Sequence, residues 1–527
     1  MTSPAAWLAQ TGRAGRIISA PGAWRADRKR LLMLLLGLLV GFEFLENGMF
    51  VFASSHIIGG VDAAPREFAQ VQAAYAVGSM MMIVLHQWLS RHFGYRRYLS
   101  GALTVFMAGA LASATSHNLA GLTLARLIQG VGGGALFTSS RVLVLLLFAP
   151  AERPRALKHF MVTIFGVGAL APLLAATLVD SWGWQWVFLS ILPLGALVLL
   201  GTWTLLPDTV GRGGEPVRWA ATPLLLFAVA ITVVQLALSE ARFDLFAHPL
   251  RLAISALIGA ARLGGFLLHQ WRHDEPLLKL RELGHPSYLT GLVLYFLYYV
   301  LSNFSNYLFP IFAERGLGLP LVTTGQLNAF TAAASLAFAF VYMKYSARLP
   351  RKKPLMAAGA LALMGAAWLF SSMPPQAPAT ALWLALALKG LFGVLMVLPV
   401  ASLTFRELGD ERFAHGYQSK NLMRQIAGSF STAFAAIGVQ NRQFANTAQI
   451  ASTLTPANPQ AVNWLDQVQA GFAHGLAPGQ AHGAALADLS RLVDQQALLM
   501  ARQDMYRLLA LLAFVTGAVV LLQRRLK

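Results

Sequence analysis

The 527-residue sequence has no cysteine and is poor in charge, with Lys, Arg, Asp and Glu together making up 12% of its residues. The absence of cysteine excludes disulfides, thiolate metal sites and cysteine nucleophiles. Soluble globular proteins carry about 25% charged residues. The deficit, together with 56% hydrophobic residues, indicates a chain that is solvated largely by lipid.

Asp and Glu, with 22 residues, are fewer than Lys and Arg, with 41, so the formal net charge is +19. Such an excess is found in nucleic-acid-binding proteins, but here the basic residues fall mostly in alternate breaks between apolar runs. That is the positive-inside pattern of membrane topology, and it predicts that both termini lie in the cytoplasm and that no nucleic acid is bound. The breaks predicted inside carry Arg91, Arg96, Arg97, Arg153, Arg155, Lys158, Arg348, Arg351, Lys352 and Lys353.

A helix crosses the hydrocarbon core with roughly 20 apolar residues. This rule predicts an all-α polytopic membrane protein with fourteen transmembrane helices, near 31–53, 68–89, 98–117, 119–148, 159–180, 185–206, 218–238, 249–270, 287–312, 322–345, 354–373, 379–404, 416–439 and 504–523. The first run follows a basic arm, 1–30, and is too long for the apolar region of a cleavable signal peptide. The segment 440–503 is predicted to be an extracytoplasmic loop with some helix over 488–504.

The chain also contains an internal repeat. Residues 90–99 align with 346–355, and Arg126 and Gly130 align with Lys389 and Gly393 at nearly the same offset. The repeat predicts two six-helix bundles, 31–206 and 287–527, joined by two linker helices over 218–270. Related halves are typical of alternating-access transporters, whose substrate site lies between them.

Several motifs resemble those of the major facilitator superfamily, in its fourteen-helix drug:proton antiporter branch (the EmrB/QacA type). They are Arg126-x-x-Gln129-Gly130-x-Gly132, Gly166-x-Gly168-x-x-Ala171-Pro172, Trp184-x-Trp186-x-Phe188 with Pro193-x-Gly195, Asn421-x-x-Arg424-Gln425-x-x-Gly428, and Gln495-Gln496-Ala497 with Asp504. The resemblance covers nearly the whole chain. It implies a major facilitator fold and proton-driven export of amphipathic small molecules from a bacterial inner membrane.

The resemblance also implies which residues move with the conformational switch: Arg91, Gly94, Arg96, Arg97, Gly130, Gly168 and Pro172. The chain departs from the family pattern in the loop after the second helix, where Gln87 replaces a glycine and Arg91 an aspartate. Ala171, Ala175 and Ala176 stand where glycine is usual, and Glu46 stands at the family's acidic position in helix one.

Glu43 and Glu46 lie within the first predicted helix, and a carboxylate inside a bilayer usually faces a cavity or a partner. Their spacing places both on one helix face together with Asn47. Arg126 is predicted at a similar depth in the fourth helix, so it is a partner for Glu46. Proton coupling at Glu46, Glu43 and Arg126 is one interpretation, and a fixed Glu46–Arg126 ion pair between two helices is the other.

Polar stripes on two later helices predict substrate contacts. Tyr295, Tyr299, Ser302 and Asn306 share one helix face, and Asn421, Gln425, Gly428 and Thr432 share another. Asn47 and Gln129 are further candidates. Aromatic walls with a few polar groups are typical of sites for amphipathic ligands, although interhelical hydrogen bonding would produce the same stripes.

No enzyme, metal or cofactor site is predicted. The glycines from 130 to 134 lack the Lys-Ser/Thr of a phosphate loop, so close helix packing explains them better. His86 and His92 are expected at the surface. The favoured function is secondary active efflux, with export of a siderophore or secreted metabolite, or a non-transporting sensor of the same fold, as alternatives. The predicted partners are the substrate, protons and lipid, together with a periplasmic adaptor protein that the outer segment could contact.

Overall fold

The computed structural model describes residues 26–526, apart from 212–220, 274–275, 350, 456, 474 and 476, and within these it contains helices and no strand. Of the predicted N-terminal arm, residues 1–25 lie outside the described part. The first half comprises α2 (Ala26–Phe52), α3 (Ser54–Gly60), α4 (Pro65–Phe93), α5 (Tyr95–Ala114), α6 (Leu119–Leu147), α7 (Arg153–Trp182), α8 (Trp186–Leu189) and α9 (Ile191–Leu205). Then follow α10 (Ala221–Ala247) and α11 (Pro249–Arg272).

The second half begins after the short helix η1 (Leu280–Leu283). It comprises α12 (Pro286–Ile311), η2 (Phe312–Gly316), α13 (Leu321–Tyr345), η3 (Ser346–Arg348), α14 (Lys353–Ser371), η4 (Ala379–Leu382), α15 (Trp383–Thr404), α16 (Asp410–Thr453), α17 (Pro459–Ala473) and α18 (Pro478–Leu522). Each of the fourteen predicted segments is therefore helical over most of its described residues.

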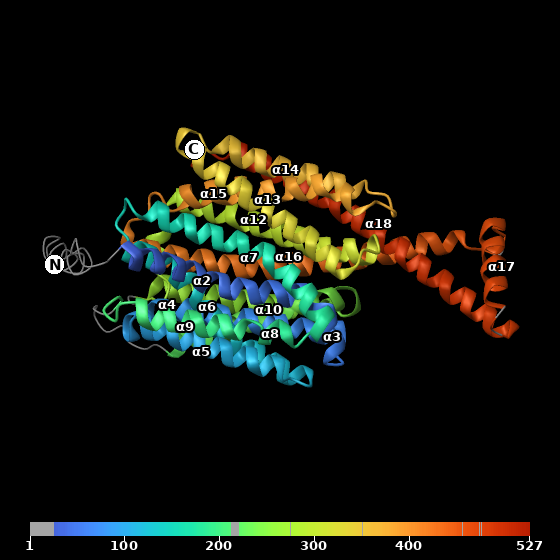
Figure 1. The fold of residues 1–527 in the computed structure, drawn as a ribbon, viewed down its shortest axis with the longest axis horizontal. Helices are drawn as coiled ribbons and strands as arrows, with labels where there is room; N and C mark the ends of the chain where they lie inside the picture. Colours follow the sequence, from blue (N-terminus) through green and yellow to red (C-terminus); the bar gives the residue numbers. More distant parts are fainter. Residues whose placement is uncertain are drawn as a thin grey trace.

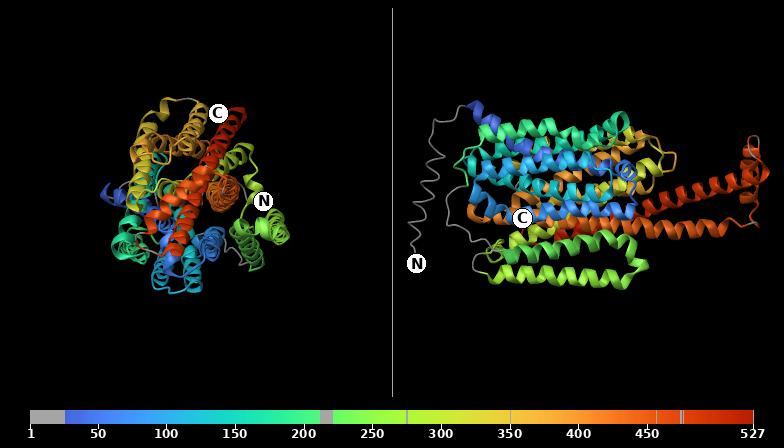
Figure 2. Two further views of the ribbon diagram at one scale, coloured as in Figure 1. Left: turned by 90° about the vertical axis from the view of Figure 1, so that its right-hand side faces the viewer. Right: turned by 90° about the horizontal axis from the view of Figure 1, so that it is seen from below.

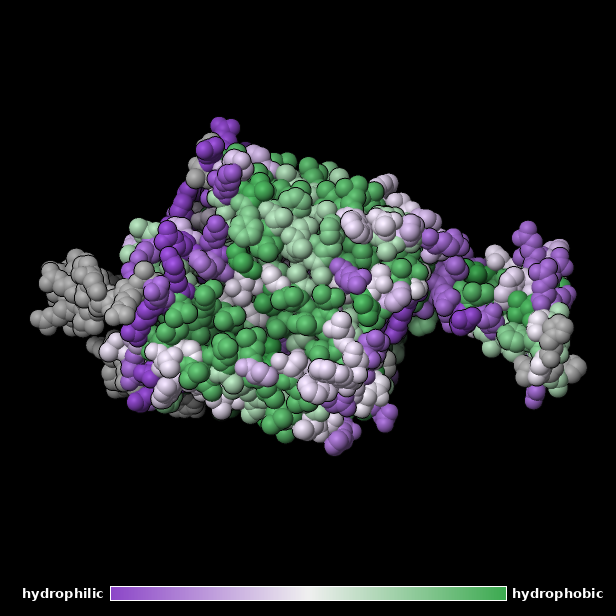
Figure 3. Space-filling model, in the orientation of Figure 1, coloured by the Kyte–Doolittle hydropathy of each residue, from purple (hydrophilic) through white to green (hydrophobic). Residues whose placement is uncertain are grey.

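Twelve described helices are long and apolar enough to cross a membrane, by length and composition. The two predicted spans that are not among them are α5, which begins with a basic turn, and α16, which carries many polar residues. Both run lengthwise within the bundle (Figure 1). The count of fourteen transmembrane helices is thus not confirmed and stays a prediction. Apolar residues predominate in the middle of the face shown in Figure 3, as contact with a bilayer requires.

Two large hydrophobic cores divide the bundle. One contains residues from α2 to α9 and the other residues from α12 to α18. The pair α10 and α11 lies at the side of the bundle (Figure 2), where α10 packs against α4 and α16 and α11 packs against α10. The cores match the predicted halves, whose boundaries remain a prediction.

Glycines allow α6 to approach its neighbours closely. A Cβ atom on Gly130 would lie 2.2 Å from the Tyr75 carbonyl oxygen of α4, and one on Gly132 would lie 2.5 Å from the Phe106 nitrogen of α5. Either distance is impossible for a real Cβ, so the glycine run serves helix packing, as predicted. Gly94, between α4 and α5, has a φ of 76°, which favours glycine for conformational reasons.

The segment 440–503 contains more helix than predicted. Helix α16 continues to Thr453, α17 follows, and α18 starts at Pro478 and runs unbroken to the C-terminal side of the chain. These helices form an extension beyond the bundle, at the end opposite to the termini end, where α2 starts and α18 ends (Figure 1). The search for apolar runs did not detect these helices because their residues are mostly polar. An extension outside the bundle needs no apolar face toward lipid.

The surface position expected for His86 is wrong. The side chain is fully buried, with Nε2 3.4 Å from the Tyr95 hydroxyl and Nδ1 3.4 Å from the Ser139 hydroxyl. Residue 86 lies within the predicted helix, but on the face of α4 that packs against α5 and α6, so neighbouring side chains cover it. His92, one and a half turns on, is exposed and stacks against Trp88.

Candidate functional site

A cavity of about 750 Å³ lies between the two halves. Helices α2, α3, α4, α6 and α7 of the first half line it, together with α12, α13, α15 and α16 of the second half and α10. Its wall on α2 runs from Glu43 to Phe52 and continues with Ser54 and Ile58 of α3. The cavity therefore extends from the middle of the bundle to the end that bears the helical extension.

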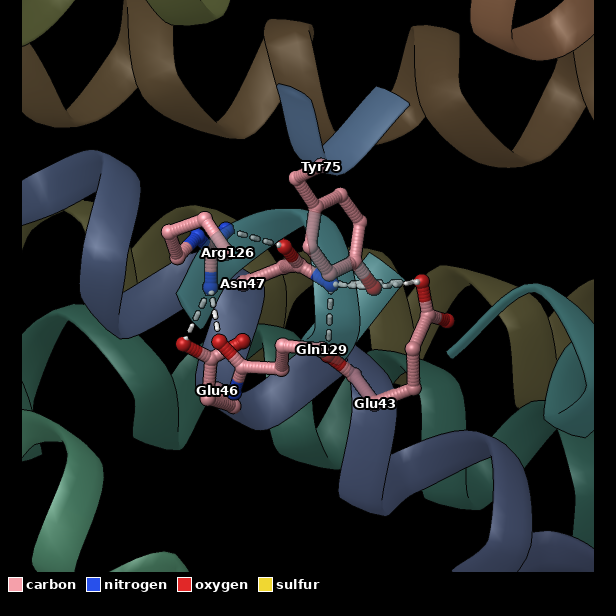
Figure 4. A network of polar contacts seen from close by, with 6 residues as sticks. All are labelled: Glu43, Glu46, Asn47, Tyr75, Arg126 and Gln129. Atoms are coloured by element: carbon pink, nitrogen blue, oxygen red, sulfur yellow. Dashed lines mark hydrogen bonds and ion pairs between the residues drawn. The ribbon is translucent and has the colours of Figure 1, made fainter. Parts of the chain in front are cut away.

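Glu46 and Arg126 form a buried ion pair beside this cavity. Arg126 Nη1 donates to Glu46 Oε1 at 2.6 Å and to Gln129 Oε1 at 2.7 Å, while Nη2 donates to Asn47 Oδ1 at 3.1 Å (Figure 4). The side chains of the pair are 0% and 2% exposed. The guanidinium also lies over the rings of Phe50 and Tyr75. The predicted meeting of α2 and α6 through these two residues is confirmed as a contact.

Glu43 occupies a different position, on the cavity wall. Its Oε1 accepts hydrogen bonds from Asn47 Nδ2 and from the Tyr75 hydroxyl, both at 3.2 Å (Figure 4). Its Oε2 has no hydrogen-bond partner among the described residues. Asn47 connects Glu43 to Arg126, so the two carboxylates belong to one network, in which Glu46 has a cationic partner within ion-pair distance and Glu43 does not.

The predicted substrate residues divide into two groups. Asn47, Ser302, Asn306 and Gln425 line the cavity. The others lie outside its lining: Gln129 bonds to Arg126, Tyr295 and Tyr299 stack with their ring centroids 5.8 Å apart, and Asn421 is fully buried. One end of each polar stripe thus faces the cavity, and the other end lies deeper in the bundle.

Hydrogen bonds from α16 close the bundle on the termini side of the cavity. Gln418 Nε2 donates to the carbonyl oxygens of Ile83 and Val84 on α4, at 2.6 and 2.7 Å. Asn421 donates to the Thr138 hydroxyl of α6 at 2.8 Å, and Gln425 donates to the Ser79 hydroxyl of α4 at 2.9 Å. Hydrogen bonds therefore join the two halves at this end, and the cavity lies between them nearer the other end.

The residues expected to move lie at contacts between helices or at the termini end. Gly168 and Pro172 line the cavity, and a Cβ on Gly325 of α13 would lie 2.9 Å from the Pro172 carbonyl oxygen, so α7 and α13 touch closely across the halves. The Arg96 guanidinium lies 4.5 Å from the centre of the Trp203 ring. Arg91 and Arg97 are exposed.

An ion pair outside the apolar bundle ties the start of α2 to the loop after α6. Lys29 Nζ lies 2.8 Å from Glu152 Oε1. The hydrogen bond from Lys29 lowers the pKa of Glu152, because it stabilises the ionised carboxylate.

Sequence analysis did not single out Tyr75, Lys420 or Arg424 as site residues. Tyr75 bonds to Glu43, Arg424 lines the cavity, and Lys420 lies one turn before Arg424 on α16. The two cations carried a usable signal, since charged residues within a bundle usually mark a functional contact. Tyr75 carried none, because a tyrosine in an apolar helix does not stand out.

Comparison with known proteins decides the family. The family model described as Major Facilitator Superfamily matches residues 25–432. The chain belongs to the major facilitator superfamily. As a member of that superfamily it is a multi-pass membrane transporter of small molecules and not an enzyme.

Curated relatives carry transporter names. The chain is 24% identical over 433 residues to "Uncharacterized MFS-type transporter YhcA" of Bacillus subtilis, covering 81% of this chain and 80% of the relative. It is 27% identical over 376 residues to "Putative multidrug resistance protein MdtD" of Salmonella typhimurium, covering 71% and 78%. These names are compatible with a drug-transporter branch, which stays a prediction.

Solved structures confirm the fold. A structure of proton-dependent oligopeptide transporters matches with a TM-score of 0.60 at 14% identity, covering 94% of this chain and 98% of that one. The human organic anion transporter MFSD10 (TETRAN) matches with a TM-score of 0.55 at 17% identity, covering 94% and 100%. At such identities the likeness concerns the fold alone.

Proposed function

We propose that the chain is a proton-coupled exporter of amphipathic small molecules that works by alternating access. The observation that carries the proposal is the position of Glu43, on the wall of a cavity shared by both halves and inside an otherwise hydrogen-bonded network. A carboxylate in such a place can take up a proton in one conformation and lose it in another, which is what coupling requires.

The geometry favours Glu43 over Glu46 as the proton carrier. Glu46 is fully buried, holds Arg126 at 2.6 Å and does not line the cavity. It fits the role of a fixed partner that holds α2 against α6. Through Asn47, the same arginine orients the hydrogen bonds to Glu43. Protonation of Glu43 would then be sensed by Arg126, whose motion would alter the α2–α6 contact.

The closed end of the cavity supports alternating access. The bonds from Gln418, Asn421 and Gln425 would have to break for the cavity to reach the termini side. If the termini face the cytoplasm, as the positive-inside rule predicts, the structure is an outward-facing state. Export as the direction of transport rests on that orientation and on the names of relatives such as MdtD.

The proposal is tested by transport in proteoliposomes with an imposed pH gradient. The wild-type protein should move a lipophilic substrate against its concentration gradient when protons flow the other way. Glu43→Gln should abolish the dependence on the pH gradient while leaving exchange of substrate intact, because glutamine preserves the hydrogen bonds of the network. Asp488→Asn, on the extension, is the matched control. Gradient-driven transport by Glu43→Gln at the wild-type rate would exclude Glu43 as the carrier.

The helical extension keeps an adaptor protein among the proposed partners. It projects from the bundle end that the charge pattern places outside (Figure 1), and Arg442 on α16 pairs with Asp504 on α18 at its base, at 3.0 Å. Deleting 454–477 should abolish copurification of such an adaptor and leave transport in proteoliposomes unchanged.

A further inference from the structure

The charges that line the cavity are mostly positive. Its lining contains a single carboxylate, Glu43, among the described residues, and four cationic side chains: Arg126, Arg242, Lys389 and Arg424. Glu46 neutralises Arg126, and Arg242 bonds to the neutral amide of Gln440 at 3.2 Å. Lys389 lies over the Phe309 ring. A cavity of this kind is unfavourable for a cationic guest and favourable for an anionic one.

A second group of cations lies directly below the cavity floor, toward the termini. Lys420 and Arg424 are one turn apart on α16. Arg141 of α6 lies 5.0 Å from the ring centre of Phe413, which stacks on Tyr417 beside Lys420. The Phe137 ring lies between the first two, 4.7 Å from Lys420 Nζ and 4.6 Å from Arg424 Cζ. Because Arg424 also lines the cavity, it connects the cavity to the buried lysine.

Aromatic rings surround Lys420. Its Nζ lies 4.3 Å from the ring centre of Tyr417, 5.4 Å from that of Tyr295 and 5.9 Å from that of Tyr299. The residue is 2% exposed. Aromatic faces stabilise a cation only partly, by about 0.5–2 kcal/mol in buried settings.

Within the described part of the chain, no carboxylate lies within ion-pair distance of Lys420, Arg424 or Arg141. Glu43 lines the same cavity as Arg424 and acts on it electrostatically from beyond that distance. Arg424 Nε is in addition buried without a hydrogen-bond partner. Charged groups are rarely retained inside a bundle unless they are paired or bind something. Lys420 and Arg424 come from the second half of the chain and Arg141 from the first. The cations without an ion-pair partner therefore lie at the interface between the halves.

We propose that Lys420, Arg424 and Arg141 form a binding site for the acidic group of an anionic amphipathic substrate. This deepens the proposed transport function and rests on it. The carboxylate of the substrate would enter past Arg424 and pair with Lys420, while its apolar body would occupy the cavity between Phe44 and Tyr298. The tyrosines 295, 299 and 417 supply hydroxyl groups and flat rings suited to an aromatic acid.

Anionic cargo also agrees with proton exchange. If protons enter as an anion leaves, an inside-negative membrane potential favours both movements. Binding of the anion would also neutralise the cations on α6 and α16, two of the helices whose hydrogen bonds close the termini end. Substrate binding at this site would therefore change the contact between the two halves.

The test uses three naphthalene probes that share one aromatic body and carry an anionic, a neutral or a cationic head group. Purified wild-type protein is titrated by calorimetry at pH 7 with 2-naphthoate, neutral 2-naphthamide and 2-naphthyl-trimethylammonium. The naphthoate should bind at least about tenfold more tightly than either other probe, as charge-assisted hydrogen bonds imply. Equal binding of all three, or tighter binding of the ammonium, overturns the proposal.

Two variants locate the site. Lys420→Met should weaken naphthoate binding at least about tenfold and leave naphthamide binding unchanged, and the ligand-free variant should melt at or above the wild-type temperature, because an unpaired buried charge is removed. A lower melting temperature with unchanged naphthoate affinity would instead show that Lys420 only clamps the aromatic rings. Arg315→Gln, a cation of η2 outside the cavity lining, is the control and should bind naphthoate as wild type does.

Binding and transport can fail separately in this design. Naphthoate binding that requires Lys420, without transport under a pH gradient, would support the site and refute the proposed exporter function. Gradient-driven transport of the ammonium probe without naphthoate binding would support the exporter and refute the anion site.

Discussion

The two halves carry a cation at corresponding positions, and it is paired with a carboxylate in the first half but not in the second. Arg126 on α6 has a carboxylate at 2.6 Å and four further hydrogen-bonding or aromatic neighbours. Lys389, its counterpart on α15, lies over Phe309 and has no acidic partner within the described chain. The neighbouring glycines differ likewise. A Cβ on Gly130 would meet backbone at 2.2 Å, and one on Gly393 would meet only the Ser335 hydroxyl at 3.9 Å.

Around Arg126 the first half therefore holds its polar groups in a fixed, neutralised network. The second half leaves Lys389, Lys420 and Arg424 without an ion-pair partner among the described residues, and the first half adds only Arg141 to this group. A fixed network is suited to holding a proton-binding carboxylate in place. Unpaired cations are suited to binding an anionic group transiently, such as the acidic group of a substrate. The following variants test this difference.

The largest effect is expected from separating Glu46 and Arg126. Breaking a buried ion pair from one side costs about 3–5 kcal/mol, because the remaining charge is left without a partner. Glu46→Gln should therefore lower the melting temperature of the purified protein markedly. The neutral double variant Glu46→Gln/Arg126→Gln should recover most of the loss, because no charge remains buried. If the double variant melts no higher than the single one, the pair does not balance charge as described.

Gly130→Ala should have the next largest effect. The added methyl group cannot fit against the Tyr75 carbonyl without separating α4 from α6, and overpacking of this kind costs about 1–3 kcal/mol. Because Tyr75 also bonds Glu43, gradient-driven transport should fall together with the melting temperature. Gly393→Ala, at the repeat-related position, is the control and should change neither property. Equal losses in both variants would contradict the asymmetry between the halves.

Apolar runs predicted the helices of the bundle because hydropathy reports contact with lipid directly. Glu46 and Arg126 could also be matched, since position along a helix gives depth in the membrane. The extension, α17 with the ends of α16 and α18, was expected as loop with some helix because its polar helices leave no hydropathy signal. Depth in the membrane could not show which of the two carboxylates is the better candidate for the proton carrier. The cavity distinguishes them, because Glu43 lines it and Glu46 does not.

The contacts between the halves could not be predicted from the sequence. Gln418 bonds to backbone carbonyls more than 330 residues away, and no local pattern encodes such a partner. The same holds for the aromatic rings around Lys420, which come from α6, α12 and α16. Charge at those positions was visible, but which charges lack partners depends on how the two bundles meet.

Gln418→Ala tests the contact between the halves. Loss of two hydrogen bonds of about 0.5–1.5 kcal/mol each should raise the population open toward the termini by roughly tenfold or more. Because the chain lacks cysteine, spin labels can be placed on His92→Cys and Arg348→Cys, at the termini end of each half, and their separation measured by pulsed EPR. Gln503→Ala, which loses a bond to Met373 within one half, should leave the distance distribution unchanged. A Gln418→Ala distribution identical to that of the parent would contradict the gate.

The smallest change in melting temperature is expected for Lys389→Met, and this variant gives the most direct comparison between the two halves. Arg126→Met strands Glu46 and should destabilise the protein, whereas Lys389→Met strands no group, because no acidic residue of the described chain pairs with Lys389. The aromatic contact that is lost is worth about 0.5–1 kcal/mol, and removing a charge that is 8% exposed offsets it. The melting temperature of Lys389→Met should therefore stay within the error of the wild-type value, while binding of an anionic probe weakens. A fall as large as that of Arg126→Met would mean that Lys389 has an anionic partner in the membrane, and the repeat-related cations would then play equivalent structural roles.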